Sequence, residues 1–339
     1  MKKFILPFVL LFVLTSCTNG YTSHSFFAMD TFISVEADNA DKVLLKELEN
    51  LVYADEKKFS RTFAGCEIYE FNKNGDGTKL TDGTVHLIMK ASDMYYKTDG
   101  AFSPFSGALT DLWNIKSTNP KVPQNEEILS ALKNCTPSDF ILSDELMSKS
   151  NPYLLLDLGG IAKGECAQNC IRFLKENGSK NAILSFGGSI ACTGHSEKNK
   201  EGWIIGIKNP FDTADIIGSI TVTDCFVSVS GAYERSFTEN GKRYHHILDL
   251  KTGYPAESDI ESTAVISKDG AVSDGLSTAL FVMGKDKAIS LYKSGVYDFE
   301  AILILKDGSI TVTDGLQDKF IFNKDAKYKN GKDLIYNNQ

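Results

Sequence analysis

The sequence predicts an α+β protein with mixed, largely antiparallel sheets and helices that flank them. Apolar residues recur with a helical period over residues 39–59, 82–97 and 161–177, and short strand-like runs recur between residues 203 and 322. The run Lys306-Asp307-Gly308-Ser309 predicts a hairpin turn between two of these runs, which makes them antiparallel neighbours. Together these patterns favour an α+β class.

The N-terminal segment is typical of a secretory signal. Lys2 and Lys3 supply a basic start, Phe4 to Val13 carries no charge, and Leu14-Thr15-Ser16-Cys17 closes the segment. An apolar core of about 10 residues is too short to span a bilayer but suits a signal peptide. The last four residues match the bacterial lipobox, which predicts that Cys17 is lipidated. An ordinary signal peptide with an incidental cysteine is the alternative.

The lipobox defines an expected domain organisation. We expect a lipoprotein signal peptide at 1–16, a lipidated polar tether at 17–25 and a single domain at 26–335 with room for two subdomains. The protein would be anchored to the cell membrane by its lipid, facing the outside of the cytoplasm. Bacterial lipoproteins carry two or three acyl chains, which makes such an anchor stable.

The net charge argues against nucleic acid as a partner, and the hydropathy argues against a membrane-spanning segment. The formal net charge of the 339-residue chain is −8, and no basic stripe is present, so nucleic acid is not an expected partner. No other segment is apolar for long enough to cross a bilayer. The lipid is therefore the predicted contact with the membrane.

The cysteines other than Cys17 are interpreted as small buried hydrophobic residues. They form no CxxC pair and no zinc-finger spacing with histidine. Cys166 and Cys170 share one helical face, where a disulfide is geometrically awkward. The six residues are Cys66, Cys135, Cys166, Cys170, Cys192 and Cys225.

In the first half of the chain the expected elements are separated by turns. Residues 32–37 alternate as a strand, and 39–59 follow as a helix. A helix at 82–97 has Asp82 as its expected N-cap and Gly100 near its end. Residues 114–150 are polar and irregular, with a short helix expected at 126–133.

From Tyr153 onward the pattern changes. Residues 153–157 predict a buried strand that ends at Gly159-Gly160, a helix at 161–177 stops at Gly178, and a strand at 181–186 ends at Gly187-Gly188. The remaining expected strands are 203–208, 217–222, 226–230, 244–249, 263–267, 300–305, 308–313 and 319–322, and the remaining helices are 271–282 and 285–294.

The segment Asp157-Leu158-Gly159-Gly160-Ile161-Ala162-Lys163-Gly164 is the sharpest local feature. A strand-like run enters paired glycines and then a helix start, whose free N–H groups attract phosphate. Lys163 places a positive charge in the first turn, against the usual dipole preference, and an anionic ligand would explain it. A plain tight turn with a solvated lysine is the alternative.

Asp274 and Thr278 lie one helical turn apart on one face. A carboxylate and a hydroxyl are hard oxygen ligands that suit Mg²⁺ or Ca²⁺. The alternative is that Asp274 is an N-cap and Thr278 an ordinary helix residue.

Two further segments could contribute to a pocket. His245 and His246 would point to opposite faces of a strand, so one of them could act as an acid or base while the other faces elsewhere. A solvent-facing histidine is the alternative. The loop Gly100-Ala101-Phe102-Ser103-Pro104 follows a helix end and could form a pocket wall.

These segments, in this order, resemble the FAD:protein FMN transferases, the ApbE-like lipoproteins. The resemblance covers residues 26–300 and rests on the order and spacing of the motifs. It implies an ApbE-like, T-fold-like architecture. The matching stretches are Met29-Asp30-Thr31, Phe59-Ser60-Arg61 with Glu67 and Asn72, Gly100-Ala101-Phe102 before Leu112-Trp113, 157–164, Phe186-Gly187-Gly188, 203–210, 230–235, 246–255 and 274–279.

The resemblance implies a reaction and its partners. The family binds FAD with Mg²⁺, splits the pyrophosphate, and transfers FMN to a Thr or Ser hydroxyl of a partner protein with release of AMP. Some relatives instead hydrolyse FAD to FMN and AMP. With the lipobox, the acceptors would be exported or membrane-bound flavoproteins.

The resemblance also implies roles for individual residues. Met29, Ala101, Phe102, Ser103, Asp157, Lys163 and Leu248 would contact FAD. The metal would be held by the backbone carbonyl of Gly160 and by the side chains of Asp274 and Thr278. His246 would lie beside the reacting phosphate, and either His246 or Asp274 could take the proton of the acceptor hydroxyl.

This chain departs from the family pattern at four positions. The family usually has aspartate and threonine where Ser103 and Phe105 stand, and serine where Cys66 stands. A tyrosine often found after the Phe-Ser-Arg run is replaced by Thr62. The leading hypothesis from the resemblance is an Mg²⁺-dependent FMN transferase. A metal-dependent FAD pyrophosphatase and a non-catalytic flavin-binding lipoprotein are the alternatives.

Overall fold

The computed structural model describes residues 20–75, 78–143, 146–331 and 334–336. The expected signal peptide and the predicted lipidation site Cys17 lie outside these ranges. Within them, no helix is long and apolar enough to cross a membrane.

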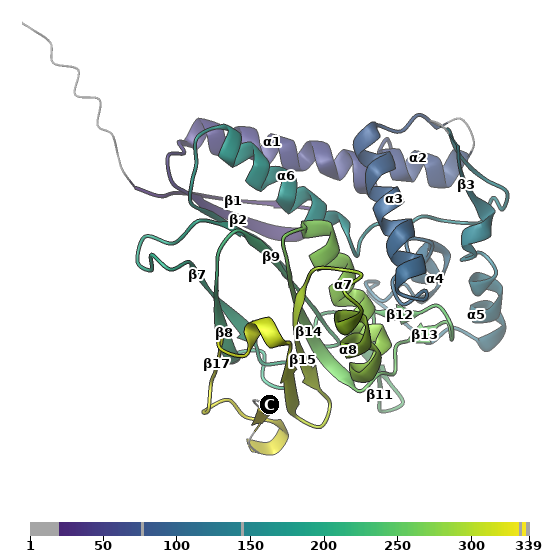
Figure 1. Ribbon diagram of the computed structural model, residues 1–339. Coiled ribbons are helices and arrows are strands. Elements are labelled where there is room, and N and C mark those ends of the chain that lie inside the picture. The colour runs from purple at the N-terminus through teal and green to yellow at the C-terminus, as the bar shows by residue number, and fades with distance from the viewer. Residues whose placement is uncertain (1–19, 76–77, 144–145, 332–333, 337–339) are drawn as a thin grey trace, which may run out of the picture.

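A nine-stranded sheet runs through the described part of the chain (Figure 1). Its order is β1-β2-β5-β6-β9-β14-β15-β16-β18, and every neighbouring pair is antiparallel except β16 and β18. The strands are β1 (Thr22–Ala28), β2 (Thr31–Ala37), β5 (Ala182–Phe186), β6 (Ser189–Thr193), β9 (Cys225–Gly231), β14 (Ile260–Ser267), β15 (Glu300–Leu305), β16 (Ser309–Val312) and β18 (Ile335–Tyr336).

Helices cover one face of this sheet. α1 (Lys42–Phe59) and α6 (Ala162–Glu176) pack over β1, β2 and β5 through one apolar cluster. α3 (Asp82–Lys97), α7 (Gly270–Met283) and α8 (Lys285–Ser294) pack over β14 and β15 through another. Because β14 lies between layers, all eight of its residues are buried.

A small sheet covers the other face. Its order is β17-β8-β7, and its apolar side chains meet Cys192, Val227 and Ile302 of the large sheet. The strands are β7 (Trp203–Lys208), β8 (Ile216–Val222) and β17 (Phe320–Phe322). β7 alternates buried and exposed residues along its whole length, as expected for an outer strand.

Of the remaining elements, α2 (Glu67–Asn74), α4 (Gly107–Trp113), α5 (Asn125–Leu132) and β3 (Phe140–Ser143) lie on the right in Figure 1. Trp113 of α4 is buried, and its indole N–H donates to the carbonyl of Gly253 at 2.8 Å. The others are β4 (Leu146–Lys149), β10 (Ser236–Glu239), β11 (Lys242–His245), β12 (Leu248–Asp249) and β13 (Tyr254–Pro255).

Several sequence expectations are confirmed. The α+β class with largely antiparallel sheets is correct. The helix expected at 82–97 has these bounds, and those expected at 161–177, 271–282 and 285–294 agree within a residue at each end. Gly308, at φ +90°, makes the expected turn between β15 and β16.

The expected strand at 153–157 is wrong. Leu154 and Leu156 are buried, but this segment pairs with no strand among the residues that the structure describes. The side chain of Asn72 instead accepts from the Leu156 N–H at 2.7 Å and donates to its carbonyl at 2.8 Å. The Asp157 N–H donates to the carbonyl of Pro104. A side-chain amide and a loop thus satisfy the backbone groups that a neighbouring strand would otherwise pair.

Other boundaries also needed correction. Residues 22–25, expected in the tether, belong to β1, because they pair with β2 from Thr22 onward. Thr81, not Asp82, is the N-cap of α3. The strand expected at 244–249 is divided between β11 and β12, whose partners are different strands. The strand expected at 181–186 ends before Gly187-Gly188 as predicted, but these glycines lead into a strand that was not expected, β6.

Candidate functional site

Helices α6 and α7 touch at a pair of glycines. A Cβ atom on Gly164 would lie 1.9 Å from the carbonyl oxygen of Gly270, and one on Gly270 would lie 2.2 Å from that of Gly164. Only glycine at these positions lets the two backbones approach so closely. This contact brings the first turn of α6 against Asp274, one turn into α7.

Asp274 is a buried carboxylate with its partners on two other elements. Its side-chain oxygens accept from the N–H of Gly164 at 3.0 Å and from the hydroxyl of Ser189 on β6 at 3.1 Å. The ammonium of Lys163 lies 3.7 Å from Oδ1. The alternative that Asp274 is an N-cap is excluded, because Asp269 occupies that position and accepts from Val272.

Thr278 and Gly160 lie beside this carboxylate. The Thr278 hydroxyl is 3.4 Å from the hydroxyl of Ser230 on β9, and it would lie 3.7 Å from a Cβ atom on Gly160. Ser277, which precedes Thr278, donates its hydroxyl to the backbone carbonyl of Asp274 at 2.7 Å within α7. The residues predicted as metal ligands from sequence, Gly160, Asp274 and Thr278, are thus brought together from the turn before α6 and from α7.

The donor chemistry of these residues fits a hard cation. The Gly164 N–H donates to Asp274, so the Gly160 carbonyl, four residues earlier, does not receive the bond that a helix would give it. A carbonyl, a carboxylate and a hydroxyl are ligands suited to Mg²⁺ and unsuited to zinc. In the described part of the chain, no group of three or more His, Cys, Asp or Glu could hold a metal ion.

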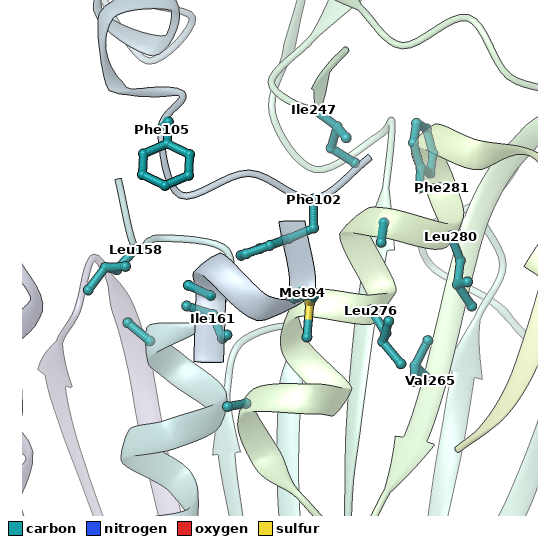
Figure 2. Close-up of a cluster of buried hydrophobic side chains, with 14 of the residues drawn as sticks. Met94, Phe102, Phe105, Leu158, Ile161, Ile247, Val265, Leu276, Leu280 and Phe281 are labelled. Atoms are coloured by element: carbon teal, nitrogen blue, oxygen red, sulfur yellow. The ribbon is translucent and has the colours of Figure 1, made fainter. Parts of the chain in front are cut away.

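The loop after α3 forms an apolar wall next to Gly160. Figure 2 shows Phe102 among Met94, Leu158 and Ile161, beside the helix that carries Leu276. A Cβ atom on Gly160 would lie 3.2 Å from the Phe102 ring. Ala101 and Ser103 flank Phe102 and are half-buried.

The unusual residues of this loop serve packing. Ser103 accepts from the N–H of Phe105 at 3.1 Å. Phe105 is buried, and its ring meets those of Tyr95 and Phe140 at centroid distances of 5.7 and 5.6 Å. The departure from the family pattern at Phe105 therefore adds to the apolar core.

Asp157 stabilises the turn that leads into α6. Its Oδ1 accepts from the Gly159 N–H at 2.9 Å, and its Oδ2 lies 3.9 Å from Nε of Arg61. The sequence reasoning gave Arg61 no role, although it lies in the Phe-Ser-Arg motif. The guanidinium also donates to Asp111 at 2.8 Å, while Nε is buried with no hydrogen-bond partner among the described residues.

Met29 lies in the turn between β1 and β2. Its φ of +51° is unusual for a side chain of this size, and its N–H donates to the Glu56 carboxylate at 2.6 Å. Next to it, Asp30 accepts from Lys116 at 2.7 Å, and this bond lowers the pKa of Asp30. The charge of Arg235 lowers that pKa further.

His246 and His245 face different surroundings, although β11 ends at His245 and His246 lies outside the strand. The backbone N–H of His246 donates to the Arg235 carbonyl at 3.1 Å, and its Nδ1 lies 3.3 Å from the same oxygen. Burial and the charge of Arg235 lower the pKa of His246 to about 4. The Nε2 atom of His245 lies 3.1 Å from the carbonyl of Ala256, away from this site.

Glu234 is a second carboxyl group that sequence reasoning missed. Burial raises the pKa of Glu234, Asp274 raises it further, and Lys163, Arg235 and Lys208 oppose the shift. A Cβ atom on Gly188 would lie 3.2 Å from its Oε1. Glu234 lies in the segment 230–235 that matches the family, and this match could have identified it from sequence. Leu248, on β12, packs with the Trp113 cluster.

Comparisons with known proteins identify the family that this chain resembles in sequence. The ApbE family model matches residues 29–303. The FAD:protein FMN transferase of Klebsiella pneumoniae (strain 342) is 30% identical over 300 residues, which cover 87% of this chain and 92% of that protein. The FAD:protein FMN transferase of Treponema pallidum (strain Nichols) is 30% identical over 263 residues, 72% of each chain.

Solved structures show the same fold. The crystal structure of the ApbE protein from Thermotoga maritima superposes with a TM-score of 0.80 at 30% identity, covering 88% of this chain and 99% of that one. The flavin transferase ApbE from Vibrio cholerae gives a TM-score of 0.79 at 24% identity, with the same coverage.

Proposed function

The chain belongs to the ApbE family, and on that basis we propose that it is an Mg²⁺-dependent FAD:protein FMN transferase. It joins FMN through a phosphoester to a Thr or Ser hydroxyl of an acceptor protein and releases AMP. The observation that carries the proposal is the meeting of Asp274, Thr278 and Gly160 beside the ammonium of Lys163. This combination suits a pyrophosphate and a divalent cation.

The cation would be held by Asp274, Thr278 and the carbonyl of Gly160. When bound, Mg²⁺ neutralises charge on phosphate oxygens. Asp274 has capacity for it, since an ionised carboxylate offers about four acceptor sites and two are used by Gly164 and Ser189. Those two bonds fix the orientation of the carboxylate before any ligand arrives.

The other residues bind and orient FAD. Lys163 supplies a second positive charge to the phosphates, and the positive end of the α6 dipole adds to it. Phe102, with Ala101 and Ser103, forms the wall next to Gly160, while Asp157, Met29 and Leu248 complete the cofactor contacts. Arg61, with its free Nε beside Asp157, is positioned to add a donor on that side.

The transfer requires that the acceptor hydroxyl lose its proton. The acceptor hydroxyl oxygen forms a bond to the phosphorus of the FMN half, and the bond from that phosphorus to the bridging oxygen breaks as AMP leaves. We assign the hydroxyl proton to Nε2 of His246, because Nδ1 faces the Arg235 carbonyl and the pKa of about 4 keeps the ring neutral. Asp274, the other candidate base, is the carboxylate that would hold the cation.

The proposed cellular location of the protein rests on its N-terminal sequence. A lipid on Cys17 would hold the protein on the membrane, outside the cytoplasm, so its acceptors would be exported or membrane-bound flavoproteins. The first described strand begins at Thr22, which leaves a short tether. The catalytic body would therefore work close to the membrane surface.

One experiment tests the activity. The purified protein is incubated with FAD, Mg²⁺ and an acceptor that carries a threonine the family modifies, and flavin fluorescence is read in a denaturing gel. Labelled acceptor with stoichiometric AMP supports transfer. FMN and AMP without labelled acceptor would indicate a pyrophosphatase, and retention of intact FAD would indicate a binding protein.

A further inference from the structure

Cys192 and Cys225 lie directly opposite each other on neighbouring strands of the large sheet. They are register partners in the antiparallel pair β6–β9, and their sulfurs are 3.9 Å apart. Both are buried, at 2% and 7% exposure, on the face that the small sheet covers. Nothing in the proposed flavin chemistry uses this pair.

The backbone geometry at this pair suits a disulfide. Directly opposed residues of antiparallel strands have Cα atoms about 4.5–5.5 Å apart. Disulfides span Cα distances of about 4.4–6.8 Å, so the strands need not move. We propose that Cys192 and Cys225 form a disulfide between β6 and β9 by exchange with a disulfide oxidant.

The other cysteines in the described part of the chain lack this arrangement. Cys166 and Cys170 are four residues apart in α6, where helix geometry disfavours a bridge. Cys135 is buried in the Trp113 cluster, and burial raises its pKa to about 11. Cys66 precedes α2 and is buried apart from the large sheet. The cross-strand pair is thus distinguished by register as well as by proximity.

The exchange would proceed in two steps. The two thiols lie within hydrogen-bonding distance, and either of them can be the donor. One thiol, as its thiolate, attacks a sulfur of the oxidant and displaces one thiolate. The other thiol then loses its proton and attacks the sulfur of the first cysteine, releasing the second thiolate. One oxidant disulfide is reduced to two thiols, and one protein disulfide forms.

The bridge would lie at the opposite end of both strands from the candidate site. β6 begins at Ser189 and β9 carries Ser230, the residues that contact Asp274 and Thr278. Cys192 and Cys225 are at the far ends, where Thr193 donates to Asp224 at 2.7 Å. The disulfide would therefore fix the two strands together without changing the site. Oxidation during folding or a local opening of these ends would give the oxidant access.

The test uses the full-length chain, purified in reductant without oxygen. One sample is equilibrated folded with mixtures of reduced and oxidised glutathione, and a second is unfolded and refolded in the same mixtures. Both are acid-quenched, unfolded and alkylated with N-ethylmaleimide, and digests are analysed by mass spectrometry. The expected result in at least one sample is a cross-linked peptide containing Cys192 and Cys225, two alkylations fewer, and reversal by dithiothreitol.

Matched variants separate this pair from the other thiols. Cys192→Ser and Cys225→Ser should each remove the cross-link, whereas Cys66→Ser should keep it. The oxidised protein should melt several degrees higher than the reduced one, because the bridge restricts the unfolded chain. Full alkylation of both residues in the folded and the refolded sample, or a cross-link to any other cysteine instead, would overturn the proposal.

Discussion

The carboxylate of Asp274 accepts a hydrogen bond from the backbone N–H of Gly164, at 3.0 Å, across 110 residues of sequence. The donor N–H lies in the first turn of α6, and it bonds to a side chain of α7 and not to a carbonyl of its own helix. This bond fixes the carboxylate and leaves the Gly160 carbonyl without its helical donor. A candidate metal site and a helix start are thus made by the same contact.

Replacement of Asp274 should abolish Mg²⁺-dependent transfer. Asp274→Ala removes a proposed ligand, and we expect a loss of more than about 100-fold in FMN transfer, since even residues that only support metal ligands contribute about 10–100-fold. Asp274→Asn keeps much of the shape and should lose activity with a weakened Mg²⁺ dependence. The measurement is the transfer rate against Mg²⁺ concentration.

Asp286→Ala, in the first turn of α8 and away from this site, is the matched control and should behave as wild type. Unchanged activity of Asp274→Ala, in a folded protein, would exclude the proposed metal site.

Gly164→Ala should destabilise the fold. A methyl group there would meet the Gly270 carbonyl at 1.9 Å, so α6 and α7 must separate. Overpacking of this kind costs about 1–3 kcal/mol or more of unfolding free energy. Gly83→Ala, in α3 with nothing within 4 Å, is the control and should be neutral or stabilising by up to about 1 kcal/mol. Urea unfolding followed by circular dichroism compares the two.

His246→Gln should lower the rate of transfer more than the binding of FAD. If Nε2 takes the hydroxyl proton, we expect about a 10²–10⁴-fold fall in kcat. Flavin fluorescence titration should give a similar Kd for FAD. His86→Gln, at an exposed position of α3, serves as the control. An unchanged kcat for His246→Gln would return the role of base to Asp274.

Burial of His245 should make stability depend on pH. Burial lowers its pKa from 6.5 to about 4, so the unfolded chain binds a proton at higher pH than the folded protein does. Unfolding therefore takes up protons between these values, and the free energy of unfolding should fall as pH decreases from 6.5 to 4. His245→Gln should reduce this slope relative to wild type. Urea unfolding at several pH values measures it, and equal slopes would contradict the prediction.

Ionisation of Glu49 should make stability depend on pH in a more acidic range. Glu49 is buried, and although burial opposes the shift, bonds from Lys46, His24 and Tyr53 lower its pKa from 4.5 to about 2. Its ionised form stabilises the protein above pH 4.5, and this contribution should be lost as pH falls toward 2. Glu49→Gln should therefore lower stability at pH 6 and bring the two proteins closer together near pH 2, as thermal melts would show.

The sequence by itself determined the features that depend on neighbouring residues. The bounds of α3 and α6, the hairpin turn at Gly308 and the one-turn spacing of Asp274 and Thr278 follow from local periodicity and turn chemistry, because these act within a few residues. The order of the motifs was also sufficient to indicate the family.

Only the tertiary structure decided which distant groups meet. Residues 153–157 look like a strand, but Asn72 satisfies the Leu156 backbone, and no local pattern reveals a partner 84 residues away. The contact of Gly164 with Gly270 and the register of Cys192 with Cys225 depend likewise on packing and strand pairing. Local sequence fixes backbone preferences, whereas close approaches between remote segments emerge only when the layers assemble.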